Sequence, residues 1–376
     1  SQFDLQNDIE KRKEIVLEIS SKIRENLVQE NIESTYNHGL LRQVAEMFLS
    51  IDDVNHAAEI IIRIGTRALS IGDVVYLKNT LKRLYNSVDL SSLNRTRLKK
   101  VEGHIYDFEN CYDLAEKTYK EMLQESIDLN DPWSRAAALN GLGTIERFSN
   151  NCEKAISLYT ESLQIRIDNK FIIDESNSHH NLGAVYIMMR DYDKAIEHLE
   201  KAKGIREKQN DIFRVSATEL YLGECYIHTQ SYNKAEKLLK QCINKKKDVQ
   251  DVVGYIWANL AMAKLIICEA ENIFTEKKLQ SNISMLEGII CESKQISHMK
   301  ECVMAQIFMA ISAMMLGCSP QNVIGMLVEA QDSKKYTLLS EYYNNLIEKL
   351  MNIALNETII PDKNGTLVQI ALQLKI

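Results

Sequence analysis

The segment Asn181-Leu-Gly-Ala-Val-Tyr186, followed by Tyr192-Asp-Lys-Ala195-Ile196, decides the fold of this chain. Its small residues recur along the sequence in equal steps. One series is Gly103, Gly143, Gly183 and Gly223, and a second with the same step is Ala115, Ala155, Ala195 and Ala235. Self-similarity at such a fixed period is typical of a protein built from stacked helical repeats.

The residue pattern of each repeat predicts two helices packed against each other. Leu182, Gly183 and Tyr186 share one face of a first helix, because three or four residues make one turn. A glycine inside a helix costs about 1 kcal/mol relative to alanine, so its recurrence indicates a close contact with the second helix. That second helix carries the alanine and, four residues later, a large side chain: Tyr119, Tyr159, Leu199 or Leu239.

These residues resemble the tetratricopeptide repeat (TPR), most clearly over residues 92–248. The 40-residue spacing is longer than the usual repeat of about 34 residues and is similar to long-helix variants of signalling adaptors. Glu146 stands at the tyrosine position of the second unit and Glu102 at the leucine position of the first. The resemblance implies an all-α fold, a right-handed solenoid of antiparallel helix pairs.

The flanks of the clear repeats predict a division into three parts. Residues 1–91 are expected to form an irregular helical region, with an amphipathic helix over 4–28, one eroded repeat over about 36–70, and a break at Gly72. Residues 92–248 hold four clear units. Residues 249–376 are expected to form divergent helical repeats and a cap, with helices over about 276–296, 299–316, 320–333 and 335–356. For residues 361–376 a strand and a capping helix both remain open.

Composition excludes several classes of function. The formal net charge is −7 and the pI is about 5.7, so we expect no direct binding to nucleic acid or to an anionic membrane. No run approaches the roughly 20 apolar residues of a membrane span. Eight cysteines without a Cys-x-x-Cys pair are typical of a reduced, cytoplasmic protein. A start at Ser1 in place of Met suggests either a piece of a longer chain or a processed N-terminus.

The sequence offers little for catalysis. Phosphate-binding glycine motifs are missing. The most metal-like feature is His179-His180 with His198, and the most nucleophile-like is Cys225 with His228 three residues later. Neighbouring histidines point to different helix faces and Cys225 falls in the expected packing core. We therefore predict a non-catalytic protein with no cofactor and no metal.

The TPR resemblance implies a concave groove lined by the first helix of each unit, and a protein or extended peptide bound there. The residues expected to contact it are polar and of mixed charge, and Asp107, Leu220 and Ile227 fall at equivalent positions. The predicted partner-binding residues are Arg97, Lys100, His104, Asn140, Thr144, Arg147, Asn177, His180 and Glu224.

Two functions remain open. The stretches Tyr36-Asn-His-Gly-Leu-Leu-Arg-Gln-Val-Ala45 and Ala57-Ala-Glu-Ile-Ile-Ile-Arg-Ile-Gly-Thr-Arg-Ala68 resemble the first repeats of STAND-class regulators. That resemblance implies a sensor or scaffold beside an adjoining nucleotide-binding domain in a longer protein. The alternative is a peptide-pheromone receptor or response-regulator phosphatase like the Rap proteins, which the length and layout fit, although no residue matches a catalytic position.

Overall fold

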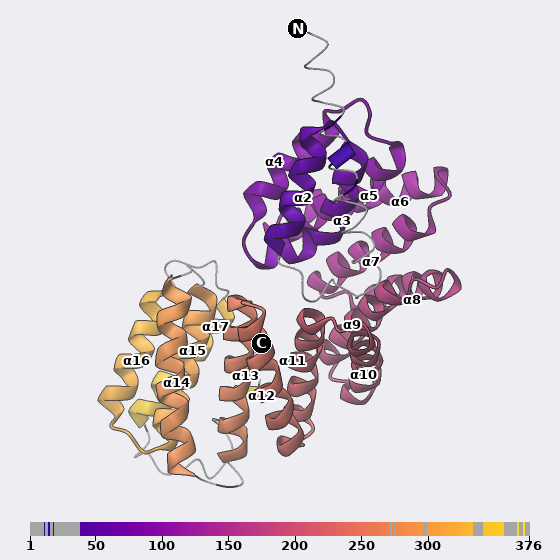
Figure 1. Ribbon diagram of the computed structural model, residues 1–376. Coiled ribbons are helices and arrows are strands. Elements are labelled where there is room, and N and C mark those ends of the chain that lie inside the picture. Colours follow the sequence, from indigo (N-terminus) through magenta and orange to yellow (C-terminus); the bar gives the residue numbers. More distant parts are fainter. Residues whose placement is uncertain are drawn as a thin grey trace. The chain divides into compact units, whose positions relative to one another are not determined.

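A computed structural model describes residues 38–270, 275–295, 299–333 and 341–356, with a few separate positions outside these ranges. Within them every regular element is a helix (Figure 1). The sixteen helices are α2 (His38–Ser50), α3 (Val54–Ser70), α4 (Val74–Tyr85), α5 (Ser92–Phe108), α6 (Tyr112–Asp128), α7 (Pro132–Phe148), α8 (Cys152–Asp168), α9 (Ile172–Met188), α10 (Tyr192–Lys208), α11 (Ile212–His228), α12 (Tyr232–Asp248), α13 (Val252–Ala270), α14 (Glu276–Gln295), α15 (Met299–Met315), α16 (Pro320–Ser333) and α17 (Glu341–Asn356).

The predicted all-α repeat fold is confirmed, since consecutive helices pack in antiparallel pairs. The break at Gly72 and the helices beginning at 276, 299 and 320 also agree with the sequence. The expected helix over 335–356 begins at Glu341 in the described part. The expected helix over 4–28 and the tail over 361–376 lie outside the described ranges.

The helices α5 to α12 share one length and one turn. Each has 17 residues, and each is joined to the next by three residues, so their starts are evenly spaced. The middle residue of each turn is left-handed, as at Asn110 (φ 60°) and Asn150 (φ 62°). The next backbone N–H closes the helix end, as Cys111 N donates to Tyr106 O at 2.8 Å. Two helices and two such turns make up the repeat period.

The glycine series marks the predicted close contacts. A Cβ on Gly103 would lie 2.4 Å from the Tyr119 ring, and one on Gly143 would lie 2.8 Å from the Tyr159 ring. On Gly183 and Gly223 it would meet Leu199 and Leu239, at 2.6 and 2.7 Å. These are the large residues four positions after each alanine, so the pattern of small and large residues encodes the helix pair.

The eroded repeat expected over about 36–70 falls on α2 and α3, which pack against each other, and its assignment as a repeat stays a prediction. The helix α3 also lies alongside α5, which is a first helix. Gly65 in α3 meets Val101 of α5 at 2.9 Å from its would-be Cβ, and Thr66 Oγ1 lies 3.4 Å from His104 Nδ1. The step from Gly65 to Gly103 is two positions shorter than the repeat period. The helix α3 thus packs against α2 and also continues the row of helices formed by α5, α7 and α9.

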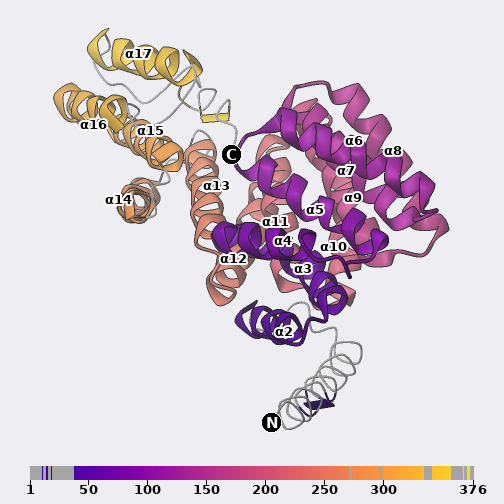
Figure 2. The same cartoon turned by 90° about the horizontal axis from the view of Figure 1, so that it is seen from above.

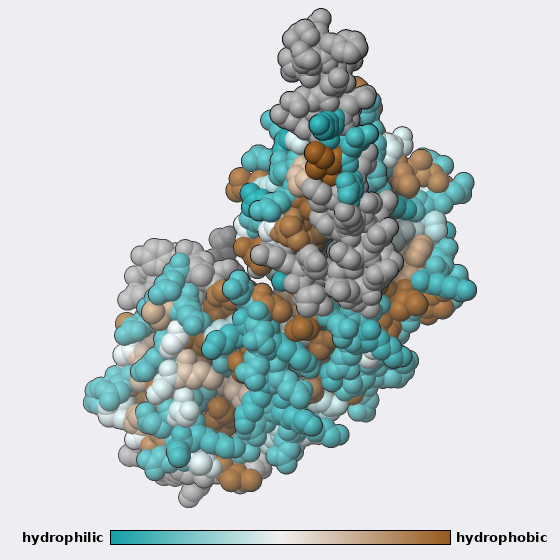
Figure 3. Space-filling model, in the orientation of Figure 1, coloured by the Kyte–Doolittle hydropathy of each residue, from teal (hydrophilic) through white to brown (hydrophobic). Residues whose placement is uncertain are grey.

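The chain divides into two compact units, residues 1–218 and 219–376. The predicted three-part division therefore stays a prediction. Unit 1 has one core that joins α2 to α5 and smaller cores between its later helix pairs, and unit 2 has one large core centred on α13 and α15. Outside the cores, hydrophilic residues cover much of the surface that Figure 3 colours, and hydrophobic residues appear as scattered patches.

The helix α13 is long and apolar enough to cross a membrane by length and composition alone. It is mostly buried inside unit 2. Its Lys264 is fully buried and pairs with Glu224 of α11. Burial against neighbouring helices and a buried ion pair are typical of a core helix.

Candidate partner-binding face

The first helices of the pairs lie on the inside of unit 1. Helices α3, α5, α7 and α9 contact one another in order. The guanidinium carbon of Arg67, in α3, lies 5.7 Å from the ring centroid of Phe213, at the start of α11. The helices α3 and α11 therefore touch although α5, α7 and α9 come between them along the chain. This contact requires that the row of inner helices curves until its two ends meet. In Figure 2, α6 and α8 lie at the rim of the unit, with α7 and α9 inward of them.

We call the surface of α3, α5, α7, α9 and residues 212–218 of α11 the inner face. Eight of the nine predicted partner-binding residues lie on it, and Glu224 belongs to unit 2. All nine are half-buried. The structure thus brings the eight onto consecutive inner helices, and several of them bind the neighbouring inner helix.

The lower-numbered end of the face is a network of charges around Trp133. Arg97 donates two hydrogen bonds to Asp131, both at 3.0 Å. Lys100 Nζ lies 5.1 Å from the Trp133 ring centroid, and Trp133 Nε1 donates to Asp174 at 2.9 Å. Burial opposes the charge of Asp174, but Lys100 and two arginines lower the pKa of its carboxyl group. Arg97 and Lys100 therefore hold α5 to α7 and α9.

The next residues surround the hydroxyl group of Tyr119. Burial lowers the pKa of His104 to about 3, so its ring is neutral at pH 7. Tyr119 donates to Asp107 Oδ2 at 2.8 Å. Burial raises the pKa of Asp107 to about 6, against the opposing effects of Tyr119 and of nearby Arg147. The carboxyl group of Asp107 therefore titrates near neutral pH, and its Oδ1 atom is buried without a hydrogen-bond partner.

Uncharged polar groups occupy the middle of the inner face. Asn140 Oδ1 accepts a hydrogen bond from Asn181 Nδ2 at 3.0 Å, which joins α7 to α9. Thr144 Oγ1 lies 3.0 Å from the hydroxyl oxygen of Tyr159, in the second helix of the same pair. Amide groups of this kind can donate to and accept from a peptide backbone.

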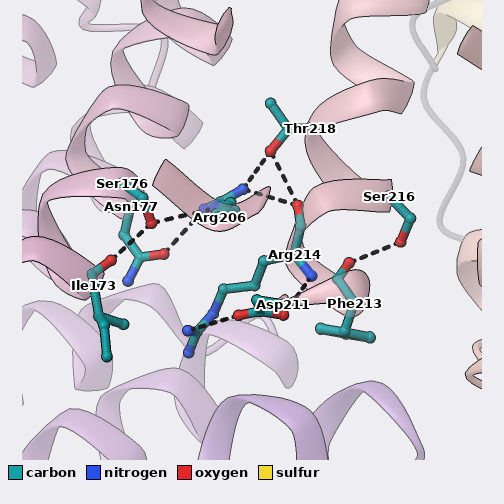
Figure 4. Close-up of polar contacts among 9 residues, drawn as sticks. All are labelled: Ile173, Ser176, Asn177, Arg206, Asp211, Phe213, Arg214, Ser216 and Thr218. Carbon is teal, nitrogen blue, oxygen red and sulfur yellow. Dashed lines mark hydrogen bonds and ion pairs between the residues drawn. The ribbon is translucent and has the colours of Figure 1, made fainter. Parts of the chain in front are cut away.

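Asn177 and His180 lie beside the buried Arg206 network, which Figure 4 shows. Arg206 of α10 donates to Asn177 Oδ1 at 3.0 Å and to Arg214 O at 3.1 Å, and also to Thr218 Oγ1. His180 Nδ1 lies 3.5 Å from the same Thr218 oxygen. Burial lowers the pKa of Arg206 to about 9, and its hydrogen-bond acceptors in this network are uncharged oxygens.

Glu224 has a different environment from the other eight residues. It accepts from Lys264 of α13 and lies 3.3 Å from His228 Nε2. Burial opposes its charge, yet Lys264 and His228 hold the pKa of Glu224 below its usual value. Its carboxylate thus serves an ion pair within unit 2.

Among the described residues, the candidate nucleophile and the candidate metal ligands of the sequence lie in other surroundings than such sites need. Cys225 is fully buried, and burial raises the pKa of its thiol to about 12. A buried thiol of this kind is unreactive, which fits the interpretation of Cys225 as a packing residue. His179 pairs with His198 through their Nδ1 atoms at 2.9 Å, and His180 takes no part in that contact. No group of three possible metal ligands occurs in the described part of the chain.

Sequence reasoning missed a ladder of buried cations. Arg166, Arg206 and Lys246 follow one another at the repeat period, near the ends of second helices, and each is at most 4% exposed. Arg166 donates to Asp174 O at 2.8 Å, and Lys246 donates to Asp251 Oδ2 at 2.6 Å. Each cation therefore anchors the start of the following first helix. The same count that located the glycines would have found them.

The comparisons agree with this architecture. Residues 174–248 match the family model described as Tetratricopeptide repeat. This segment is therefore built of tetratricopeptide repeats, and the stacked helix pairs around it are consistent with a TPR solenoid. No curated protein sequence matches the chain.

Three solved structures share the fold at low identity. One is a STAND protein with a tetratricopeptide repeat sensor from Pyrococcus horikoshii (TM-score 0.57, 14% identity), where the match covers 89% of this chain and 50% of that one. Another is NprR in complex with its cognate peptide NprX (TM-score 0.54, 13% identity, 86% and 91% covered). The third is a Rap protein complexed with Competence and Sporulation Factor (TM-score 0.50, 10% identity, 89% and 100% covered).

Proposed function

We propose that the inner face of unit 1 binds an extended peptide segment and that the chain is the sensor or scaffold part of a signalling protein. One observation carries the peptide-binding role. Half-buried guanidinium, ammonium, imidazole, amide and hydroxyl groups occur on successive inner helices, from Arg97 and Lys100 through Asn140 and Thr144 to His180. An extended chain presents a donor and an acceptor at every residue, so a row of such groups suits its backbone.

The fold of NprR supports the class of ligand, because that protein is described in complex with a peptide. The likeness to the STAND protein supports a sensor role, because its repeats are described as a sensor. A non-catalytic role is supported by the inert Cys225 thiol and by the use of the inner-face charges in contacts between helices. The Rap-like phosphatase remains the alternative, favoured only by the shared fold.

Selection from a library of linear peptides displayed on phage tests this function directly. We expect peptides to be enriched on the parent protein and to lose affinity for the double variant Asn140→Ala, Asn177→Ala, because both amides are removed from the inner face. A matched control is Gln124→Ala, an exposed amide of the outer helix α6. Thermal unfolding of all three proteins checks that the double variant is folded.

The result contradicts the proposal if no peptide is enriched, or if enriched peptides bind the folded double variant as well as the parent. Incubation with a phosphorylated receiver domain tests the alternative. Accelerated loss of the phosphoryl group would favour the Rap-like phosphatase, and an unchanged rate would favour a binding module.

A further inference from the structure

Arg67 lies where the inner face closes on itself. It occupies the last turn of α3, and its guanidinium carbon lies 5.7 Å from the ring centroid of Phe213. Three other inner helices, α5, α7 and α9, come between these two residues along the chain. A ligand that contacts Arg67 on the inner face therefore lies beside both α3 and the start of α11.

Four other cations of the inner face each lie beside a carboxylate. Arg97 pairs with Asp131, and Arg214 pairs with Asp211, both with a nitrogen-to-oxygen distance of 3.0 Å. The remaining two lie near acidic groups that sense their charge, Arg147 near Asp107 and Lys100 near Asp174.

Arg67 departs from this rule. It makes no ion pair with any residue in the described part of the chain, and its Nη1 atom is buried without a hydrogen-bond acceptor. The helix dipole favours a positive charge at the C-terminal end of α3, where Arg67 lies. The dipole supplies no acceptor for Nη1, however, and the Phe213 ring attracts the cation through its face without accepting a conventional hydrogen bond. An acceptor is therefore missing at this point of the inner face.

The surroundings favour an anionic acceptor. Behind the inner face lies the buried Arg206, whose hydrogen-bond acceptors are uncharged oxygens. Arg206 thus places a buried positive charge near α11, where the carboxylate of Asp211 also acts on it. A carboxylate accepts two parallel hydrogen bonds from a guanidinium group and neutralises it, which a backbone carbonyl cannot do.

We propose that Arg67 is a binding residue for a carboxylate side chain of an extended acidic peptide, held between α3 and α11. This inference rests on the proposed function and specifies the chemistry of the ligand. The peptide backbone lies along the inner-face amides, and an aspartate or glutamate supplies the acceptor that Nη1 lacks.

The test uses the full chain and the linear peptide library described above. Peptides enriched on the parent are expected to contain Asp or Glu. Their affinity is then measured for the parent, Arg67→Gln and Arg63→Gln, the last being an exposed arginine one turn earlier in α3. The same peptides are made with every Asp and Glu replaced by Asn and Gln.

We expect Arg67→Gln to weaken binding of the acidic peptides about 10- to 100-fold, as for the loss of one charge-assisted hydrogen bond. The amide versions should bind the parent with a similar loss, and the two changes together should cost little more than either alone. Arg63→Gln should bind as the parent does. Equal thermal unfolding of the two arginine variants verifies that both are folded.

Neutral enriched peptides, or acidic ones that bind folded Arg67→Gln as tightly as the parent, would overturn the role of Arg67 and leave inner-face peptide binding standing. A library that yields no binder at all would overturn both. Binding that depends on Arg67 but is unaffected by the amide replacements would show a neutral acceptor and refute the acidic ligand.

Discussion

The substitution Gly103→Ala tests the packing of the helix pairs most directly. Its Cβ would lie 2.4 Å from Cε1 and 2.5 Å from Cζ of Tyr119. That ring is fully buried, and a Cβ on Gly141, in α7, would also meet it at 2.5 Å. Since glycines approach the ring from two helices, moving away from one brings it toward the other. We expect overpacking to cost about 1 to 3 kcal/mol.

A gain in helix propensity opposes this cost, since alanine is favoured over glycine by about 1 kcal/mol in a helix interior. Gly204→Ala, in α10, provides the control. A Cβ there meets no atom within 4 Å, so this variant should show the gain alone. The difference in unfolding free energy between Gly204→Ala and Gly103→Ala should therefore be about 1 to 3 kcal/mol, the steric part.

The assay is urea unfolding followed by tryptophan fluorescence. The chain has two tryptophans, Trp133 in unit 1 and Trp257 in unit 2. In a Trp257→Phe background the signal comes from Trp133 and reports the unit that contains both glycines. The reasoning is refuted if Gly103→Ala is stabilised as much as Gly204→Ala, because the Tyr119 ring would then have room for the added carbon.

Three further measurements address the turns and the buried titratable groups. Arg190 has a left-handed backbone (φ 61°), so Arg190→Gly should raise the unfolding free energy by about 0.5 to 1 kcal/mol. Asn150→Gly should raise it by less, because asparagine tolerates this conformation. Equal gains in urea unfolding would contradict the strain assigned to Arg190. Burial lowers the pKa of His198 and lowers that of His179 to about 4, so the stability they provide is complete above pH 6.5 and is lost as the pH falls toward 4. His198→Phe should flatten the stability curve in that window, measured by unfolding at a series of pH values, and an unchanged slope would count against it. Burial raises the pKa of Asp107 from 3.8 to about 6, so the stability that its protonated carboxyl group provides is complete below pH 3.8 and is lost as the pH rises through 6. Asp107→Asn should therefore be more stable than the parent at pH 8 but not at pH 4. The same difference in unfolding free energy at both pH values would exclude this titration.

The repeats could be predicted because their signal is local. A small residue such as Gly183 and the large Leu199 that fills its contact lie in the same helix pair. Counting at a fixed interval finds such contacts wherever the interval holds. The step from Gly65 to Gly103 is two positions short of that interval, so the same count does not find the contact between α3 and α5.

The candidate site could be predicted only in part. The helix period puts Asn140 and Asn177 on the side of their helices that was expected to face a partner, and that role stays a prediction. The helix period does not reveal that Asn140 accepts from Asn181 or that Asn177 accepts from Arg206, because these bonds depend on the distance between neighbouring pairs.

The contact between Arg67 and Phe213 was beyond prediction for a related reason. The small rotations between successive repeats add up along the array. A slight change in each would move α3 away from α11, and no single stretch of sequence records that sum. Arg67 therefore stands out only once the helices are placed in space.

Because the helices and turns of α5 to α12 are uniform, the chain can become shorter or longer by one whole repeat. Deleting Asn151–Arg190 would join Asn150 to Asp191. Asp191 directly precedes a second helix, α10, just as Asn151 directly precedes α8. The new junction would have the same three-residue turn, with a left-handed asparagine in the middle. Recombination between neighbouring repeats can thus remove or insert one whole module without disturbing any turn, while altering the circumference available to a ligand.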